Sequence, residues 1–508
     1  MASTVAGSQY GFFAPPGTTL NVVFSPDGTN PPAAVSGVFN LEIITSPTGT
    51  SYTLPSGYQG LALLPGGTGQ ALNLLLGNVN VVDSGSFDSI IAGSGNSSIG
   101  GGTGDTITGG TGADLIDGSK GNESITGGSS GSETIYGGAG DTINPGSENV
   151  TIGGAKGDSI AGGASGGVDF FDGSAGNQAI GGGVSGSETI WGGAGDTIAG
   201  DGGANETIGG VAGDTIFGGT GTELIDGSKG NQSITGGGIG NETIFGGAGD
   251  TIKGGSATET IGGAQGDTIT GGFGDTLFVD GSKGNQSITG GVSSNATIWG
   301  GAGDTISGGG VKNLLIGGAQ GDTITAATSL AGTTIDGSKG NQSITGGHQG
   351  DVVTIYGGAG DTINGGGSTD TIGGAAGDTI IGGSGPEFID GSKGSQAITI
   401  GNATSGNGAA TIWGGAGDTI GAGTGIALIG MGGLANQIIN DNTGVYNDTI
   451  TAFSQSAGDR IHLTTDTVSN ALAHTTQVNG GQDTQITLSD GSTILLKGIP
   501  SIDSTFFS

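Results

Sequence analysis

The sequence predicts an all-β protein folded as a parallel β-roll, or β-solenoid, in which each coil of the chain stacks on the coil before it. Three observations lead to this prediction. Glycine accounts for 124 of the 508 residues, cysteine is absent and aromatic residues make up only 5%, a composition unsuited to ordinary packed domains. An apolar residue, usually isoleucine, recurs about every nine residues. The segment Gly-Gly-Ala-Gly-Asp-Thr-Ile occurs six times, each time after an aromatic residue.

The first part of the chain, residues 1–88, lacks this regular spacing and is predicted to be a small N-terminal β module. Residues 20–24, 38–44 and 72–82 have the apolar, β-branched composition of strands, with Pro and Gly turn signals between them. Its carboxylates Asp27, Glu42, Asp83 and Asp88 are scattered along the sequence. Nothing in this module therefore resembles a catalytic cluster.

Residues 89–424 are predicted to form the solenoid itself. One strand and one turn take about nine residues, so a coil of two strands takes about 18. This length gives about 17 coils between Ile99 and Ile420. Three coils make a longer repeat of 54 to 56 residues, marked by Asp117 in Asp-Gly-Ser-Lys-Gly-Asn and by its counterparts Asp172, Asp226, Asp280, Asp336 and Asp390.

The regular spacing ends near Thr424, and residues 425–508 are predicted to form a C-terminal β cap. Longer apolar runs alternate there with Asp-Gly turns. A cap is expected because an open last coil would expose unpaired backbone N–H and C=O groups to other chains.

The charge balance points to cations as partners. The chain has 44 acidic and 10 basic residues and a net charge of −34, which repels nucleic acid and favours bound metal ions. No apolar run approaches the ~18 residues of a membrane span, and residues 1–10 lack the pattern of a signal peptide. The absence of cysteine fits a secreted protein that needs no disulfides.

An acidic residue usually stands two positions before the inward isoleucine. Stacked coils would place these carboxylates about 4.8 Å apart, so their repulsion predicts an ion between coils. Oxygen ligands without His or Cys suit Ca²⁺. The alternative is that each Asp only caps a solvated turn. The predicted metal ligands are Asp105, Asp114, Asp141, Asp158, Asp196, Asp214, Asp250, Asp267, Asp304, Asp322, Asp361, Asp378 and Asp418.

These turns resemble those of the RTX family of calcium-binding β-rolls, whose nonapeptide is G-G-x-G-x-D-x-U-x with U apolar. Residues 109–117, Gly-Gly-Thr-Gly-Ala-Asp-Leu-Ile-Asp, match every position, and residues 218–226 match except for Glu223. The resemblance implies calcium held by turn carbonyls and by Asp114 and its counterparts. Residues 448–463 and 490–498 are similar to the C-terminal region of RTX exoproteins, which implies an uncleaved type I secretion signal and an extracellular location.

Six aromatic residues follow inward isoleucines and are therefore expected to point outward, one every three coils or ~14 Å. They are Tyr136, Trp191, Phe245, Trp299, Tyr356 and Trp413. A stripe in one register favours a contact surface, either for assembly or for sugar stacking, although cross-strand packing would also explain it. Outward Thr and Ser residues also align, which raises ice binding as a further alternative.

Catalysis is not expected. His348, His462 and His474 are isolated, and no known catalytic spacing occurs in the sequence. The sequence therefore predicts a secreted, calcium-stabilised structural protein that assembles with itself into a filament, surface layer or biofilm matrix. The alternatives are an adhesin for cell-surface glycans and an ice-binding protein.

Overall fold

A computed structural model of the chain describes residues 2–6, 18–29, 31–45, 51–64, 68–74, 77–146, 149–163, 167–256, 258–326, 332–348, 350–367, 369–401, 410–421, 423–432, 435–441 and 446–508. The chain divides into two compact units, residues 1–256 and residues 257–508. Each unit is described by itself below.

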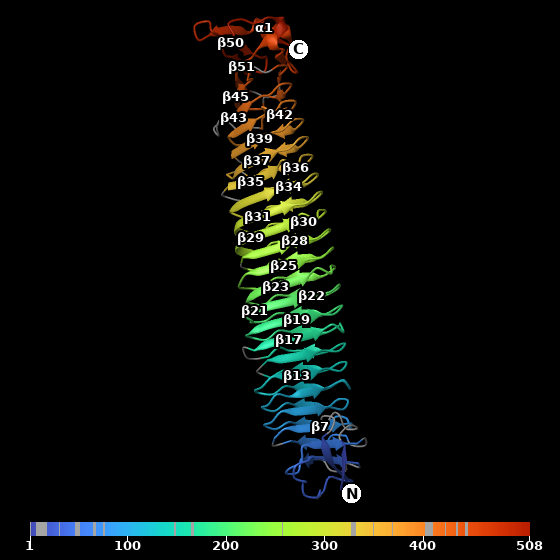
Figure 1. Ribbon diagram of the computed structural model, residues 1–508. Coiled ribbons are helices and arrows are strands. Elements are labelled where there is room, and N and C mark those ends of the chain that lie inside the picture. Colours follow the sequence, from blue (N-terminus) through green and yellow to red (C-terminus); the bar gives the residue numbers. More distant parts are fainter. Residues whose placement is uncertain are drawn as a thin grey trace. The chain divides into compact units, whose positions relative to one another are not determined.

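Both units are β-solenoids (Figure 1), which confirms the predicted fold class. Short strands alternate between two sheets, named A and B here, and each strand pairs in parallel with the strand of the next coil. In sheet B of the first unit, for example, Ile125 lies opposite Ile143. In sheet A, Ile135 lies opposite Ile152. The two units together contain about 22 coils.

In the first unit, sheet A contains β2 (Thr19–Ser25), β3 (Phe39–Ile44), β5 (Gly60–Leu63), β7 (Val79–Asp83), β9 (Ser97–Gly100), β11 (Leu115–Asp117), β13 (Glu133–Tyr136), β15 (Val150–Gly153), β17 (Val168–Gly173), β19 (Ser187–Gly192), β21 (Asn205–Gly209), β23 (Thr222–Gly227) and β25 (Glu242–Gly246). Sheet B contains β4 (Ser51–Thr53), β6 (Ala71–Asn73), β8 (Ser89–Ile91), β10 (Thr106–Thr108), β12 (Ser124–Thr126), β14 (Thr142–Asn144), β16 (Ser159–Ile160), β18 (Ala179–Gly181), β20 (Thr197–Ala199), β22 (Thr215–Phe217), β24 (Ser233–Thr235) and β26 (Thr251–Lys253).

In the second unit, sheet A contains β27 (Glu259–Gly262), β29 (Phe273–Gly281), β31 (Val292–Gly300), β33 (Asn313–Gly317), β35 (Gly332–Gly337), β37 (Val352–Gly357), β39 (Thr369–Gly373), β41 (Glu387–Asp390), β43 (Ala410–Trp413), β45 (Ile426–Gly430) and β47 (Asn447–Thr451). Sheet B contains β28 (Thr268–Thr270), β30 (Ser287–Thr289), β32 (Thr305–Ser307), β34 (Thr323–Thr325), β36 (Ser343–Thr345), β38 (Thr362–Asn364), β40 (Thr379–Ile381), β42 (Ala397–Thr399), β44 (Thr419–Gly421), β46 (Ile438–Asn440) and β48 (Arg460–His462).

The core of each unit is a column of isoleucines between the two sheets. Ile135, Ile198, Ile298 and Ile363 are each fully buried, as are most of their counterparts. Burying one such side chain contributes about 2 kcal/mol. Because side chains in a strand alternate between faces, the residue two positions before each isoleucine also points into the core. In the second unit, for example, Asp304 is buried beside Ile306.

The coils of the first unit begin earlier than the sequence indicates. Strands β2, β3, β5, β7 and β9 pair in parallel throughout, so the strands of the predicted N-terminal β module from β2 onward are themselves part of the stacked coils of the solenoid. Their turns are longer and lack the glycine spacing, which explains why the periodicity did not reveal them. Strand β1 (Ala2–Ala6) pairs antiparallel to β2 and covers one edge.

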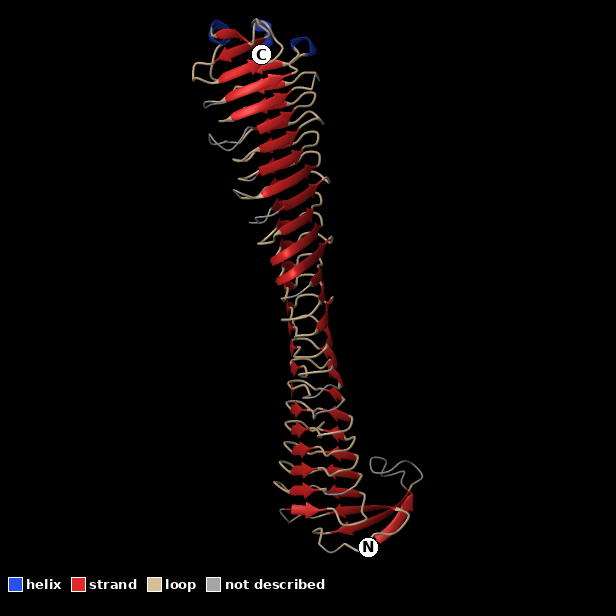
Figure 2. Cartoon of the chain, turned by 90° about the vertical axis from the view of Figure 1, so that its left-hand side faces the viewer, coloured by secondary structure: helices blue, strands red, loops and turns tan. Residues whose placement is uncertain are grey.

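The coils of the second unit continue to β48, beyond the predicted boundary at residue 425. The estimate of about 17 coils counted only residues 99–420, and the additional coils lie before and after them. Strands β49 (Thr475–Val478), β50 (Asp483–Thr487) and β51 (Thr493–Leu496) then form an antiparallel cap in which β51 pairs with β47. The described helices, η2 (Gln455–Ala457), α1 (Val468–Ala473) and η3 (Ser504–Phe506), lie in this region (Figure 2).

Candidate functional site

The aspartates predicted as metal ligands form a hydrogen-bonded ladder along the turns. Asp141 illustrates the pattern: its Oδ2 accepts the N–H of Gly138 in its own turn at 2.7 Å, and its Oδ1 accepts the N–H of Glu123 in the preceding coil at 2.8 Å. The side chain is only 1% exposed. Hydrogen bonds to a charged group contribute about 1.5–3 kcal/mol each. The carboxylate therefore joins neighbouring coils directly.

Almost all of the predicted ligands have this double contact. Ten further aspartates in the turns before sheet B or sheet A each accept two backbone N–H groups, one local and one from the preceding coil: Asp105, Asp114, Asp158, Asp196, Asp214, Asp304, Asp322, Asp361, Asp378 and Asp418. Asp250 does the same, and Asp267 accepts the N–H of Ala264.

The local sequence produces this geometry through a glycine immediately before the aspartate. Gly140 has a φ of 82°, a left-handed conformation that glycine adopts without steric cost. The turn it allows brings the N–H of Gly138 to the carboxylate of Asp141. Burial raises the pKa of Asp141 to about 6, while the N–H bonds from Glu123 and Gly138 oppose the rise.

This arrangement is a poor fit to a calcium ion at the repeated aspartates. Both oxygens of each doubly bonded carboxylate already accept N–H donors, for example those of Asp304 from Gln286 and Gly301. An ion between the coils would face these donors, whose partial charge is positive. The ladder satisfies the carboxylates without a metal, so calcium at these positions remains a prediction that the hydrogen bonds do not require.

Glutamine replaces aspartate in every third coil of the ladder. The Nε2 of Gln178 donates to the carbonyl of Gly173 at 3.0 Å, and Gln232, Gln286, Gln342 and Gln396 make the same bond to the glycine five residues earlier. Glu123 occupies this place in its own repeat. Its two buried carboxyl oxygens have no hydrogen-bond partner, and burial, followed by the charges of Asp141 and Asp105, raises its pKa to about 9.

A second set of buried carboxylates lies in sheet A of the first unit. Five consecutive coils place an acid at the same inward position, with direct cross-strand pairing: Asp169, Glu188, Glu206, Glu223 and Glu242. Each is at most 3% exposed. Burial and then the neighbouring acids raise the pKa of Glu188 and of Glu223 to about 8. The spacing of an acidic residue two positions before the inward isoleucine was recognised in the sequence, but the burial of this column was not predicted.

The corresponding inward positions of the second unit are mixed. Five successive coils carry the uncharged residues Leu277, Ala296, Leu314, Thr333 and Val353, whereas buried acids occupy the position in other coils, namely Glu259, Asp370, Glu387 and Asp448. The acidic column is therefore a feature of particular coils and is not required by the fold.

Three carboxylates that the sequence analysis treated separately come together near the start of the first unit. One oxygen from each of Asp83, Asp88 and Asp105 lies within 4.8 Å of the others, and all three side chains are buried. Asp105 was among the predicted ligands. Asp83 and Asp88 were missed because they precede the regular repeats, although the short spacing between them was a usable signal.

The six predicted contact residues all lie on the outer face of sheet A. In the first unit Tyr136, Trp191 and Phe245 are 52%, 43% and 48% exposed. In the second unit the exposed fractions of Trp299, Tyr356 and Trp413 are 41%, 54% and 52%. Their predicted outward direction is confirmed.

A typical aromatic residue of the stripe lies between an aspartate of the preceding coil and a glycine of the next coil. Trp191 lies opposite Asp172 in the preceding coil and opposite Gly209 in the next coil. A Cβ atom on Gly209 would lie 2.2 Å from the indole ring, so the ring rests directly over this glycine. Trp299 is placed over Gly317 in the same way. The order Asp, aromatic, Gly thus repeats every three coils within each unit.

The outer face of sheet B is polar by contrast. In the second unit, β28, β30, β32, β34, β36 and β38 each present two outward residues at matching registers. These residues are Thr268 and Thr270, Ser287 and Thr289, Thr305 and Ser307, Thr323 and Thr325, Ser343 and Thr345, and Thr362 and Asn364.

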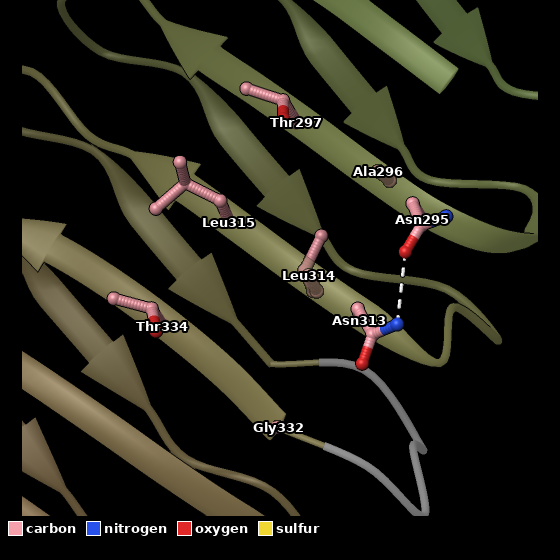
Figure 3. A pocket seen from close by; sticks show the side chains of 8 residues that line it. All are labelled: Asn295, Ala296, Thr297, Asn313, Leu314, Leu315, Gly332 and Thr334. Carbon is pink, nitrogen blue, oxygen red and sulfur yellow. Dashed lines mark hydrogen bonds between the residues drawn. The ribbon is translucent and has the colours of Figure 1, made fainter. Parts of the chain in front are cut away.

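A shallow pocket of about 320 Å³ lies on sheet A of the second unit (Figure 3). Leu315 projects between Thr297 and Thr334, and the Nδ2 of Asn313 donates to the Oδ1 of Asn295 at 2.9 Å. No charged side chain lines the pocket. The three histidines lie elsewhere and are exposed.

Within the described part of the chain, no helix is long and apolar enough to cross a membrane. Searches of protein-family models, of curated proteins and of solved structures found no match to this chain.

Proposed function

We propose that this protein is an extracellular structural β-solenoid whose units assemble with copies of the same chain through the outer face of sheet A. Filaments, a surface layer or a biofilm matrix would all use such a contact. The observation that carries the proposal is the stripe of half-exposed aromatic residues at three-coil intervals on that face.

The stripe is broader than single aromatic residues. In the first unit Phe170 and Leu224, which are 37% and 38% exposed, lie in the coils just before Trp191 and Phe245. A monomeric soluble protein rarely exposes apolar groups in a repeated column. Because the column has the same period in every copy, one favourable contact between two copies is repeated about every 14 Å along the unit.

An extracellular location is supported by three features of the sequence. The net charge of −34 and the absence of cysteine suit a protein outside the cell. The resemblance of the turns and the C-terminal region to RTX exoproteins supports type I secretion. Copies of so acidic a chain repel one another, and dissolved salt screens this repulsion. We therefore expect assembly to increase with ionic strength.

The test compares the full chain with two variants in 150 mM salt. In the first variant Trp191→Ser and Phe245→Ser remove two members of the stripe. In the control, Phe217→Ser removes an aromatic residue from sheet B. Its exposed fraction, 45%, lies between those of Trp191 and Phe245, 43% and 48%. Sedimentation velocity and negative-stain electron microscopy should show large assemblies for the wild type and the control but not for the stripe variant. A monomeric wild type, or equal assembly of all three proteins, would contradict the proposal.

Glycan binding is a second candidate, favoured by the setting of the rings. A ring held flat over a glycine exposes its other face, and Asp172 stands beside Trp191 in the preceding coil. Sugars stack on such faces and donate hydroxyl groups to carboxylates. Binding of a glycan array by a monomeric chain, lost in Trp191→Ala, would favour an adhesin over a self-assembling protein.

Ice binding is favoured by a different surface, the hydroxyl array on sheet B of the second unit. Eleven of its twelve outward residues are Thr or Ser in register. The discriminating measurement is thermal hysteresis of the purified chain, with Thr305→Tyr in the middle of the array as the variant. Hysteresis that disappears in this variant would favour ice binding.

A further inference from the structure

The double N–H contact of the regular aspartates is incomplete at Asp88 in the first unit. In the regular turns the second oxygen of the aspartate accepts the N–H three residues earlier, as Asp105 does from Gly102 at 2.6 Å. The corresponding donor for Asp88 is Gly85, but its N–H donates to the Oδ1 of Asp83 at 2.8 Å. Asp83 thus takes the N–H that would satisfy Asp88.

This arrangement leaves two buried carboxylate oxygens without donors. Asp88 still accepts the N–H of Gln70 through Oδ1 at 2.6 Å, and its own N–H donates to Asp105 at 2.9 Å. The Oδ2 atoms of both Asp83 and Asp88 are buried and have no hydrogen-bond partner. A buried acceptor left unpaired costs about 1–3 kcal/mol, and more when it is charged.

No basic side chain is available nearby in the sequence to neutralise this cluster. Residues 1–119 contain no Lys, Arg or His, and the first basic residue is Lys120. Asp83, Asp88 and Asp105 are 2%, 1% and 0% exposed.

We propose that Asp83, Asp88 and Asp105 bind one divalent cation of the calcium type, and that this is the one specific metal site among the described residues. One oxygen from each carboxylate lies within 4.8 Å of the others, and the unpaired Oδ2 atoms of Asp83 and Asp88 are free to contact a hard ion. Calcium is favoured over magnesium because Mg²⁺ usually retains several waters, and three almost fully buried residues leave little space for them. Asp105 keeps its two N–H bonds and would offer a remaining lone pair to an ion held mainly by Asp83 and Asp88. Among the described residues, the other regular aspartates lie in no such group of three carboxylates and contribute hydrogen bonds instead of metal ligands.

The ion would join three elements. Asp83 ends β7 in sheet A, Asp88 precedes β8 in sheet B, and Asp105 precedes β10 in the next coil. Binding should therefore stabilise the coils that contain β7, β8 and β10 and leave the later coils unchanged. This inference does not depend on the proposed assembly, because the cluster is buried and the stripe lies on the outer face.

The experiment is calorimetric titration of the chelator-treated full chain with CaCl₂ in 150 mM KCl, where weak binding to surface charge is screened. The expected stoichiometry is one, with at least a tenfold loss of affinity in Asp88→Asn and in Asp83→Asn. Asp141→Asn, which alters a regular ladder position, should retain the single site. Hydrogen exchange of the amides of β8 and β10 should slow with calcium in the wild type and in Asp141→Asn, but not in Asp83→Asn or Asp88→Asn.

Several outcomes would overturn the proposal. Absence of calcium binding would mean that a proton shared by the carboxylates stabilises the cluster. A stoichiometry near twelve would restore calcium to the regular aspartates, and tighter binding of MgCl₂ would reject the assigned type of ion. Circular dichroism without calcium checks that Asp83→Asn and Asp88→Asn fold. If one of them does not fold, the calcium affinity of the other tests the site. Unchanged affinity in a folded variant would place the ion elsewhere.

Discussion

Replacing Glu123 by Gln should stabilise the protein at neutral and alkaline pH. Glu123 stands where the other repeats have glutamine, whose amide donates to a glycine carbonyl, as Gln178 does to Gly173. An ionised Glu123 has no hydrogen to donate to the equivalent Gly118, and both of its oxygens are buried without partners. The variant Glu123→Gln supplies the missing donor and removes a buried charge.

The size of the effect follows from the pKa of Glu123, which is raised from 4.5 to about 9, chiefly by burial. The unfolded chain releases this proton above pH 4.5, whereas the folded protein retains it until about pH 9. The free energy of unfolding therefore falls as pH rises through this range, by about 1.4 kcal/mol per unit. Between pH 5 and pH 8 this amounts to about 4 kcal/mol, which solvent screening at the turn reduces to roughly 2 kcal/mol.

Denaturant unfolding followed by circular dichroism at pH 5 and pH 8 measures the effect. Because coils unfold as neighbouring units, hydrogen exchange of β12 and β14 should be recorded as well. Glu123→Gln should match the wild type at pH 5 and exceed its stability at pH 8. The control Asp226→Asn changes an outward carboxylate and should show no such pH dependence. Equal pH dependence in wild type and Glu123→Gln would refute the argument.

Two further predictions concern the first unit. Raising the pH from 6 to 9 should reduce the exchange protection of amides in β19 to β25, after correction for base catalysis, because burial and neighbouring acids raise the pKa of Glu188 and of Glu223 to about 8 and both ionise over this range. An equal loss of protection in β29 to β37 of the second unit, where the inward position is uncharged, would contradict this. Gly209→Ala should displace the Trp191 ring and change tryptophan fluorescence, whereas Gly238→Ala, which has nothing within 4 Å of its added Cβ, should not; identical spectra of the two variants would argue against the ring's position.

The sequence predicted the features that depend on periodicity. The isoleucine spacing identified the solenoid and the inward positions, and the residue after each isoleucine, such as Trp191, was correctly expected to face outward. The same alternation places Asp141 inward beside Ile143. Because stacked carboxylates repel one another, the sequence suggested that a bound ion stabilises them, whereas in the structure backbone N–H groups do so. The geometry of each turn decides which N–H groups reach a carboxylate, and the residue spacing alone does not predict that geometry.

Other features could not be predicted from the repeats because they lie where the chain departs from the repeat pattern. Asp83 and Asp88 meet Asp105 only after the chain has completed a further coil, so their sequence separation conceals the contact. The early coils were hidden by irregular turns between β2 and β7. The repeats thus predicted the solenoid, whereas the acidic cluster and the early coils lie in segments that depart from the repeats.

The substitution of Gln for Asp in every third coil has a consequence for how the gene can change length. The orders Asp, Asp, Gln along the ladder and Asp, aromatic, Gly along sheet A share one three-coil period. Duplication or deletion of a whole period of 54 to 56 residues joins coils that already meet elsewhere in the chain. A change of length in steps of this size would thus preserve the two shared patterns, the ladder and the Asp, aromatic, Gly order of sheet A, at the new junction.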